Sequence, residues 1–248
     1  MMRAVGVLAG ILDDAQRAGR IRTNPARGAE NLPKKETKKT RRYLTDAEVL
    51  RFAAAIADPV RSVLVLVLAY TGLRWSEAIG LRVRDVNPLR RRLHVRRPLV
   101  ELDGIFHEGE PKSWERRTVP YPEFLAPALE HLMAGHGPDD HLFVEEGGFH
   151  IRQPHVARSW FLAGLAAAGI ERLTPHDLRH TAASLAISSG ANVKAVQRML
   201  GHKSAALTLD IYADLFDDDL DAVATRLNER VSPADVGKVW ANAGIRTA

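Results

Sequence analysis

The chain has 248 residues, 46% hydrophobic and 26% charged, with a formal net charge of +5, which is the composition of an ordinary globular protein. It holds no cysteine, so disulfides, thiolate nucleophiles and zinc–cysteine sites are excluded. We expect a cytosolic protein without a membrane partner, because the longest apolar run (residues 63–70) is shorter than the roughly 20 residues of a transmembrane helix and the N-terminus lacks the layout of a cleavable signal.

The first predicted element is an amphipathic helix at residues 5–18, followed by a stretch rich in proline, glycine and charge that is typical of a linker. A single helix cannot bury its own apolar face, so it either docks elsewhere or ends a domain whose earlier part is absent. We expect a helical segment at residues 1–33, a basic linker at 34–43, a main domain at 44–230 and a tail at 231–248.

From residue 43 the pattern becomes globular and mostly helical. TDAE at residues 45–48 matches a capping box, and Gly72 ends the second helix of this part. Short β-like runs between residues 83 and 119 predict a small antiparallel sheet. Helices are expected at residues 45–56, 58–70, 74–81, 122–133, 154–168, 176–188, 193–200, 205–215 and about 218–230. The predicted fold is therefore α+β, mainly α with a small antiparallel β-sheet.

Charge is spread unevenly along the chain. Every charged residue between positions 204 and 225 is acidic, and setting these six aspartates aside leaves +11 on the rest. Basic residues gather at positions 34–42, 82–97 and 115–117. A single run is usually a solvated surface, whereas three runs favour a polyanionic partner, with nucleic acid first.

The stretch TPHDLRHTAASLAISSG, residues 174–190, places two histidines and an arginine on one turn of a predicted helix. Arg179 lies at the edge of the apolar stripe, so His176 and Arg179 can point the same way, next to the core but outside it. A functional site would have this pattern, and so would an ordinary solvated face. The stripe consists of Leu178, Ala182 and Leu185.

Four further stretches each carry one residue suited to phosphate chemistry. They are Arg74 in TGLRWSE, Lys112 in PKSWERRTVP, His202 in LGHKS and Tyr212 in DIYADL. Together with the histidine and arginine of the HDLR turn, these residues resemble the tyrosine recombinase (phage integrase) family in order and spacing. The resemblance covers residues 43 to about 230, the whole of the expected catalytic domain.

These residue types form a coherent site for phosphoryl transfer, in which a protein mainly positions groups and stabilises charge. A guanidinium can bond two phosphate oxygens, so Arg74 and Arg179 would hold both non-bridging oxygens of one phosphodiester, with His202 as a third donor. Tyr212 is the candidate nucleophile. Because a phenol with a pKa of about 10 is only about 0.1% ionised at neutral pH, it needs a base or a strongly positive site.

The resemblance also implies roles and partners. The family's base stands at the position of His176, and the position of Lys112 supplies the proton to the leaving 5′-oxygen. A 3′-phosphotyrosyl link preserves one ester bond, so the expected activity is site-specific cleavage and rejoining of double-stranded DNA without ATP, metal or another cofactor. A homotetramer on paired sites is expected, with the tail after residue 230 packed into a neighbouring protomer and accessory DNA-bending factors as further candidate partners. Glu77 matches an acidic position that would orient neighbouring basic groups.

Plain structural interpretations compete with these assignments. A lone tyrosine is most often partly buried with a satisfied hydroxyl, and His202, after a glycine helix stop, could simply favour the helix dipole. The two histidines of the HDLRH turn are spaced like zinc ligands, but no third ligand is evident, so we expect no metal and interpret His180 as structural. Arg116 and Arg117 are alternatives to Lys112 as the basic residue of this segment that lies nearest the phosphate.

The chain departs from the family at its N-terminus. Members carry a helical core-binding domain, and residues 1–33 of this chain resemble only the last helix of that domain. A truncation, an internal start and a remnant gene are the alternative explanations of this short N-terminal part. We expect intact chemistry with impaired or absent site binding, because phosphate contacts carry most of the affinity for DNA. Rival functions are a non-catalytic helix-turn-helix DNA-binding protein, based on residues 182–200, a relaxing enzyme of the type IB topoisomerase class, and a metal-dependent nuclease or transposase.

Overall fold

The computed structural model describes residues 2–29, 42–109, 116–154, 159–212, 215, 225 and 227–231. The chain divides into two units, residues 1–41 and residues 42–248, and each is described by itself. The first unit contains helix α1 (Met2–Arg17), where the sequence predicts a helix at 5–18. The turn after α1 folds back on the helix, because the Asn24 side-chain amide donates to the Ala9 carbonyl at 2.8 Å and to the Asp13 carboxylate at 2.7 Å.

The core of the second unit is built around α3, which is almost wholly apolar and packs against α2, α4, α5 and α7. Asp58 caps its start and Pro59 occupies its first turn, while Gly72 ends it in the left-handed conformation at φ 65°. The predicted capping box is confirmed at the start of α2, where Thr45 and Glu48 bond each other's backbone N–H. These first helices are α2 (Asp46–Ala54), α3 (Pro59–Thr71) and α4 (Trp75–Ile79).

The strands form two antiparallel sheets, where the sequence predicts one. The first sheet has the order β1-β2-β5, and it pairs Leu93 with Val119, both of which are fully buried. The second is a hairpin of β3 and β4 closed by Asp103 and Gly104, whose φ values of 50° and 80° give the backbone twist that a two-residue turn needs. The strands are β1 (Val86–Asn87), β2 (Arg92–Val95), β3 (Leu99–Leu102), β4 (Ile105–Glu108) and β5 (Arg117–Pro120), with 3₁₀ turns at Val83–Asp85 and Glu123–Leu125.

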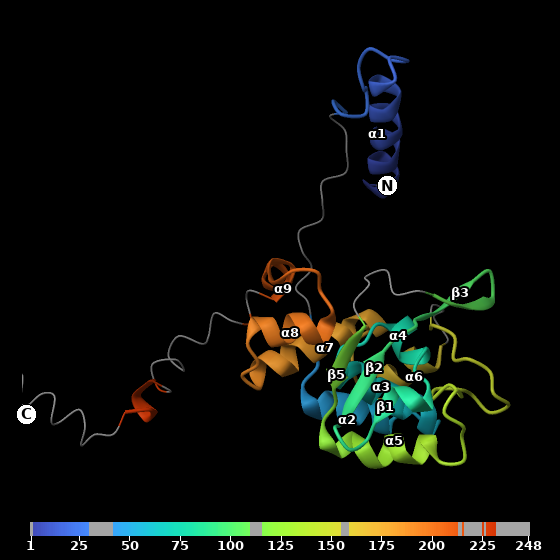
Figure 1. The fold of residues 1–248 in the computed structure, drawn as a ribbon, viewed down its shortest axis with the longest axis vertical. Coiled ribbons are helices and arrows are strands. Elements are labelled where there is room, and N and C mark those ends of the chain that lie inside the picture. Colours follow the sequence, from blue (N-terminus) through green and yellow to red (C-terminus); the bar gives the residue numbers. More distant parts are fainter. Residues whose placement is uncertain are drawn as a thin grey trace, which may run out of the picture. The chain divides into compact units, whose positions relative to one another are not determined.

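The remaining helices carry most of the candidate site. Helices α7, α8 and α9 lie together in the second unit, and α8 also contacts β5 (Figure 1). The predicted bounds of α8 are confirmed, and α7 begins behind a capping box of Thr174 and Asp177. The helices are α5 (Ala126–Met133), α6 (Trp160–Ala167), α7 (Pro175–Ser188), α8 (Val193–Leu200) and α9 (Ala205–Tyr212).

Several predicted helix bounds are wrong. Helix α2 ends at Ala54 and not at residue 56, and α5 begins at Ala126 and not at residue 122, since a 3₁₀ turn precedes it. Two further bounds differ as well. Helix α4 ends at Ile79 and not at residue 81, and a Cβ on the following Gly80 would lie 2.4 Å from the Arg97 carbonyl oxygen. Helix α6 begins at Trp160 and not at residue 154, because the Ser159 hydroxyl caps it. Most of the helix predicted at 218–230 and the tail lie outside the described residues.

The predicted fold class, mainly α with small antiparallel β-structure, is confirmed. In the part of the chain that the structure describes, every helix is too short or too polar to cross a bilayer.

Candidate active site

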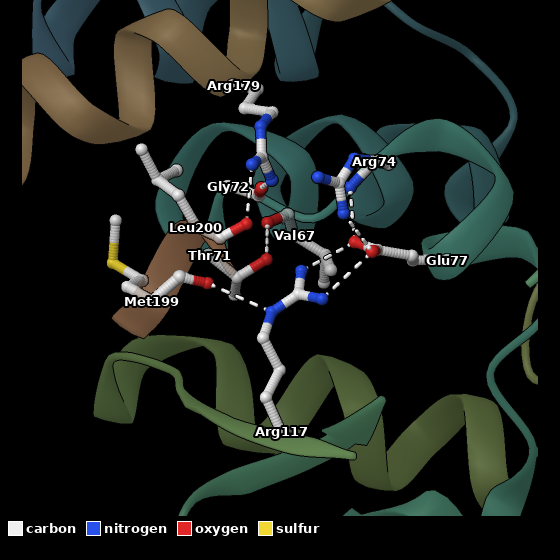
Figure 2. A network of polar contacts seen from close by, with 9 residues as sticks. All are labelled: Val67, Thr71, Gly72, Arg74, Glu77, Arg117, Arg179, Met199 and Leu200. Atoms are coloured by element: carbon white, nitrogen blue, oxygen red, sulfur yellow. Dashed lines mark hydrogen bonds and ion pairs between the residues drawn. The ribbon is translucent and has the colours of Figure 1, made fainter. Parts of the chain in front are cut away.

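Arg179 is the centre of the candidate site, and its side chain is inside the core. The sequence placed it beside the core, but it is only 3% exposed. Its two Nη groups donate to the backbone carbonyls of Gly72 and Leu200, which lie at the C-terminal ends of α3 and α8 (Figure 2). Helix C-termini present unpaired carbonyls with partial negative charge, so they can hold a buried cation. Burial and the charge of Arg74 lower the Arg179 pKa to about 10, which leaves the guanidinium charged at neutral pH.

Arg74 immediately precedes α4 and points outward, with 45% of its side chain exposed. Its backbone N–H and its Nη1 donate to the two carboxylate oxygens of Glu77 at 2.8 and 2.7 Å. Because the same carboxylate holds both the backbone and the side chain, the guanidinium has a defined direction. Figure 2 shows the guanidinium groups of Arg74 and Arg179 directed into one region.

Glu77 joins Arg74 to a third arginine, Arg117 on β5. Arg117 donates two hydrogen bonds to the Glu77 carboxylate in a bidentate arrangement, at 2.9 and 2.6 Å. It also donates to the Met199 carbonyl at 3.3 Å. Burial by itself would raise the pKa of Glu77, but the hydrogen bonds and charges of the two arginines hold it at about 2. The expectation that Glu77 orients neighbouring basic groups is therefore confirmed, and Arg117 belongs to this framework.

His202 follows Gly201, which ends α8 in the left-handed conformation, and its Nδ1 lies 3.0 Å from the hydroxyl of Thr208. Burial, followed by the charges of Arg179 and Arg74, lowers the His202 pKa to about 4. The ring is therefore neutral at pH 7, which argues against a charged histidine placed for the helix dipole. In the tautomer in which Nδ1 accepts from the Thr208 hydroxyl, the ring hydrogen is on Nε2, where it can serve as a neutral donor.

Tyr212 is the last residue of α9 and is only 1% exposed. Its ring packs into a cluster that also contains Ala183, Ile187, Val196 and Leu200, which belong to α7 and α8. Its hydroxyl oxygen lies 2.8 Å from Nδ1 of His180. This contact is absent from the sequence-based site, because a bond between α7 and α9 depends on how the two helices pack.

His176 lies exposed in the first turn of α7, one turn before His180. The two rings meet edge to face, with centroids 5.0 Å apart. Lys112 lies outside the described residues, and Arg116 is exposed just after that gap.

The predicted residues are joined by short links. Arg179 donates to the backbone carbonyls of Gly72 and Leu200, which lie two residues before Arg74 and His202 respectively. The next residue along the chain, His180, hydrogen-bonds Tyr212. The structure therefore brings five of the six predicted residues to the region where α3, α7, α8 and α9 meet. Among the residues described, there is no group of three or more histidines, aspartates or glutamates arranged to hold a metal ion.

A mainly helical domain that gathers arginines, a neutral histidine and a tyrosine in this order along the chain defines a known class of protein. Residues 42–218 match the model of the phage integrase family, and the chain therefore belongs to that family. It is 31% identical over 209 residues to a phiRv2 prophage integrase of Mycobacterium tuberculosis and 31% identical over 186 residues to a tyrosine recombinase of Thermosipho africanus. These alignments cover 82% and 73% of this chain but 55% and 60% of the relatives, so the chain spans little more than half their length.

Solved structures share the fold. An integrase of transposon Tn1549, solved with a circular intermediate DNA, superposes with a TM-score of 0.75 at 23% identity, covering 89% of this chain and 78% of that one. A XerA recombinase superposes with a TM-score of 0.57 at 24% identity, covering 94% and 72%.

Proposed function

We propose that this chain acts as a site-specific DNA recombinase, which cleaves and rejoins strands of double-stranded DNA through a 3′-phosphotyrosyl intermediate. The observation that carries the proposal is the hydrogen-bonded linkage around Arg179, which connects the segments bearing Arg74, His202 and Tyr212. The proposed catalytic set is Arg74, Lys112, His176, Arg179, His202 and Tyr212.

The arginines would bind the scissile phosphate. Arg179 uses two of its five N–H groups on backbone carbonyls, and its other N–H groups would donate to phosphate oxygens. Arg74 is held by Glu77 and is 45% exposed, so it can meet a phosphate that arrives from solvent. A neutral His202 would add a donor through Nε2. Such preorganised donors act on the charge that develops in the transition state, and each is typically worth on the order of 10²–10³ in rate.

The phenol oxygen of Tyr212 would attack the phosphorus, forming the 3′-phosphotyrosyl bond as the 5′-oxygen leaves. A proton donor must serve that leaving oxygen, and we assign this role to Lys112. His176, exposed at the start of α7, would contact the bound strand. Attack by the 5′-hydroxyl of a second strand reverses the step, because one ester bond replaces another.

The experiment is covalent trapping. The chain is incubated with DNA duplexes that carry one 5′-bridging phosphorothiolate, flanked by randomised sequence. Cleavage at this linkage releases a thiolate that rejoins poorly, so the covalent adduct accumulates. We expect a detergent-resistant protein–DNA adduct that maps to Tyr212, forms in EDTA and is absent in Tyr212→Phe. An adduct on another residue, or none, would contradict the proposal.

The same pool separates the rival functions. The adducts of a recombinase should contain a narrow set of flanking sequences. A relaxing enzyme of the topoisomerase class would form its adduct with DNA of any flanking sequence. A helix-turn-helix regulator would bind DNA and form no adduct. Membership of the phage integrase family favours neither rival.

Partners and domain roles complete the proposal. We assign residues 1–33 to the end of a core-binding domain, 34–43 to a linker, 44–230 to the catalytic domain and 231–248 to a tail exchanged between protomers. The expected assembly is a homotetramer on paired sites, with DNA-bending factors as accessory partners. Loss of synapsis on deleting residues 232–248 would support the tail exchange, and unchanged synapsis would refute it.

A further inference from the structure

His180 makes the hydrogen bond to the oxygen that would act as the nucleophile. Its Nδ1 lies 2.8 Å from the Tyr212 hydroxyl oxygen, and the two ring centroids are 5.7 Å apart. A phenol of ordinary pKa requires a proton acceptor within hydrogen-bond reach before it can attack phosphorus at neutral pH. An unprotonated imidazole nitrogen at this distance meets that requirement.

The position of Tyr212 is fixed by the helix that carries it. Thr208 and Tyr212 are four residues apart, so they lie on one face of α9. Thr208 bonds His202 at 3.0 Å and Tyr212 bonds His180 at 2.8 Å, so two polar contacts one turn apart dock this face. Both residues are buried: Thr208 is fully buried and Tyr212 is 1% exposed. This burial limits the access of water, which could otherwise accept the proton of the phenol.

His176, to which the family resemblance gives the role of base, is placed differently. It lies exposed in the first turn of α7, and its ring meets the ring of His180 edge to face at 5.0 Å. The ring of His180 thus contacts both His176 and Tyr212. This order of contacts leaves His176 nearer to the solvent from which a DNA strand arrives.

We propose that His180 is the catalytic residue that accepts the proton of Tyr212 during strand cleavage, an inference that rests on the proposed recombinase function. The proton moves from the Tyr212 oxygen to Nδ1 of His180 as the bond from that oxygen to phosphorus forms. The bond between phosphorus and the 5′-oxygen breaks, and the leaving oxygen takes a proton from the separate donor assigned to Lys112. In the rejoining step, His180 returns its proton to the departing Tyr212 oxygen.

The surrounding charges make this transfer part of the attack. Ordinary phenol and imidazole pKa values differ by about 3.5 units, so a complete transfer beforehand is unfavourable. Arg179, the chain neighbour of His180, and Arg74 stabilise negative charge on the phenolate and the phosphate but oppose positive charge on the imidazole. The proton therefore moves when the developing phosphate charge is present to offset the imidazolium.

The first experiment uses variants that separate hydrogen bonding from proton transfer. His180→Asn keeps an acceptor oxygen near the place of Nδ1 but cannot take a proton, and His180→Phe keeps the ring shape without an acceptor. His131→Asn makes the same substitution at an exposed position on α5 and serves as the control. Adduct formation is timed on the randomised phosphorothiolate duplexes and on matched duplexes with an ordinary 5′-oxygen.

We expect His180→Asn and His180→Phe to slow adduct formation on the order of 10²-fold or more on both duplexes, and His131→Asn to match wild type. Lys112→Ala should be slow on the oxygen duplex only, since a thiolate leaves without a proton. Wild-type rates in His180→Asn, or its rescue by the thiolate leaving group, would overturn the assignment to His180 while leaving the recombinase proposal intact. If wild type formed no adduct at all, both proposals would fall.

A second measurement needs no variant at the histidine. Nitrogen-15 NMR of the full chain reports which ring nitrogen of His180 carries the hydrogen. We expect an unprotonated Nδ1 at neutral pH whose signal changes in Tyr212→Phe. A protonated Nδ1 would make the ring a donor to the phenol oxygen, and the proposed transfer could not take place through that contact.

Discussion

Glu77 positions Arg74 through hydrogen bonds that it accepts from Arg74 and Arg117. We therefore expect Glu77→Gln to destabilise the second unit strongly. The glutamate is only 7% exposed and accepts hydrogen bonds from Arg74 and Arg117. The Gln side chain has nearly the same volume, but it loses the charge and turns an N–H₂ group towards donors. One guanidinium contact is therefore lost within a buried site.

The magnitude follows from the pKa of Glu77. A fall from 4.5 to about 2 corresponds to about 3 kcal/mol at 1.36 kcal/mol per unit. Breaking a buried ion pair by removing one partner typically costs about 3–5 kcal/mol, which agrees. For a unit of this size, about 3 kcal/mol lowers the melting temperature by roughly 6–12 °C.

The control is an ion pair of similar geometry on the surface. Arg91 and Glu123 are 2.6 Å apart, but their side chains are 48% and 82% exposed. Because solvent screens such a pair, Glu123→Gln should move the melting temperature by no more than about 2–4 °C. Burial is the main difference between the two substitutions.

The assay is thermal unfolding followed by circular dichroism between pH 1.5 and pH 7. A carboxylate of depressed pKa contributes stability that is fully present above pH 4.5 and is lost as the pH falls through about 2. The difference between wild type and Glu77→Gln should therefore be largest at pH 5–7 and vanish below about pH 2. A melting temperature within 2 °C of wild type at pH 7, or a difference that persists at pH 1.5, would refute the reasoning.

Three further predictions concern the same site. Gly72→Ala should destabilise the unit more than Gly104→Ala in urea titrations, because both glycines have positive φ but only at Gly72 would the new Cβ lie 2.6 Å from another side chain, that of Leu200. Arg179→Lys should slow adduct formation on the order of 10²–10³-fold, because an ammonium cannot span two carbonyls and a phosphate; a rate within tenfold of wild type would contradict this. The pKa of His202, lowered from 6.5 to about 4, should make stability fall as the pH drops from about 6.5 to about 4, and His202→Asn should remove that slope in pH-dependent unfolding.

The local pattern of the sequence predicts most elements, and it supplies the list of candidate site residues. Helix α8 has the predicted bounds, and Thr45 and Gly72 cap their helices as expected. These features depend on side-chain period and on groups within one turn of each other, which a single stretch of sequence contains. The order of the motifs along the chain likewise indicated the family.

Contacts between distant residues were decided only by the tertiary structure. Arg179 bonds a carbonyl 107 positions away, Arg117 bonds Glu77 across 40 positions, and His180 bonds Tyr212 across 32. The helical period placed Arg179 at the edge of an apolar stripe, but the carbonyls that let a cation enter the core belong to other helices. For the same reason the sequence alone does not indicate the contact between His180 and Tyr212, since the approach of α9 to α7 is set by packing and not by the pattern of either helix alone.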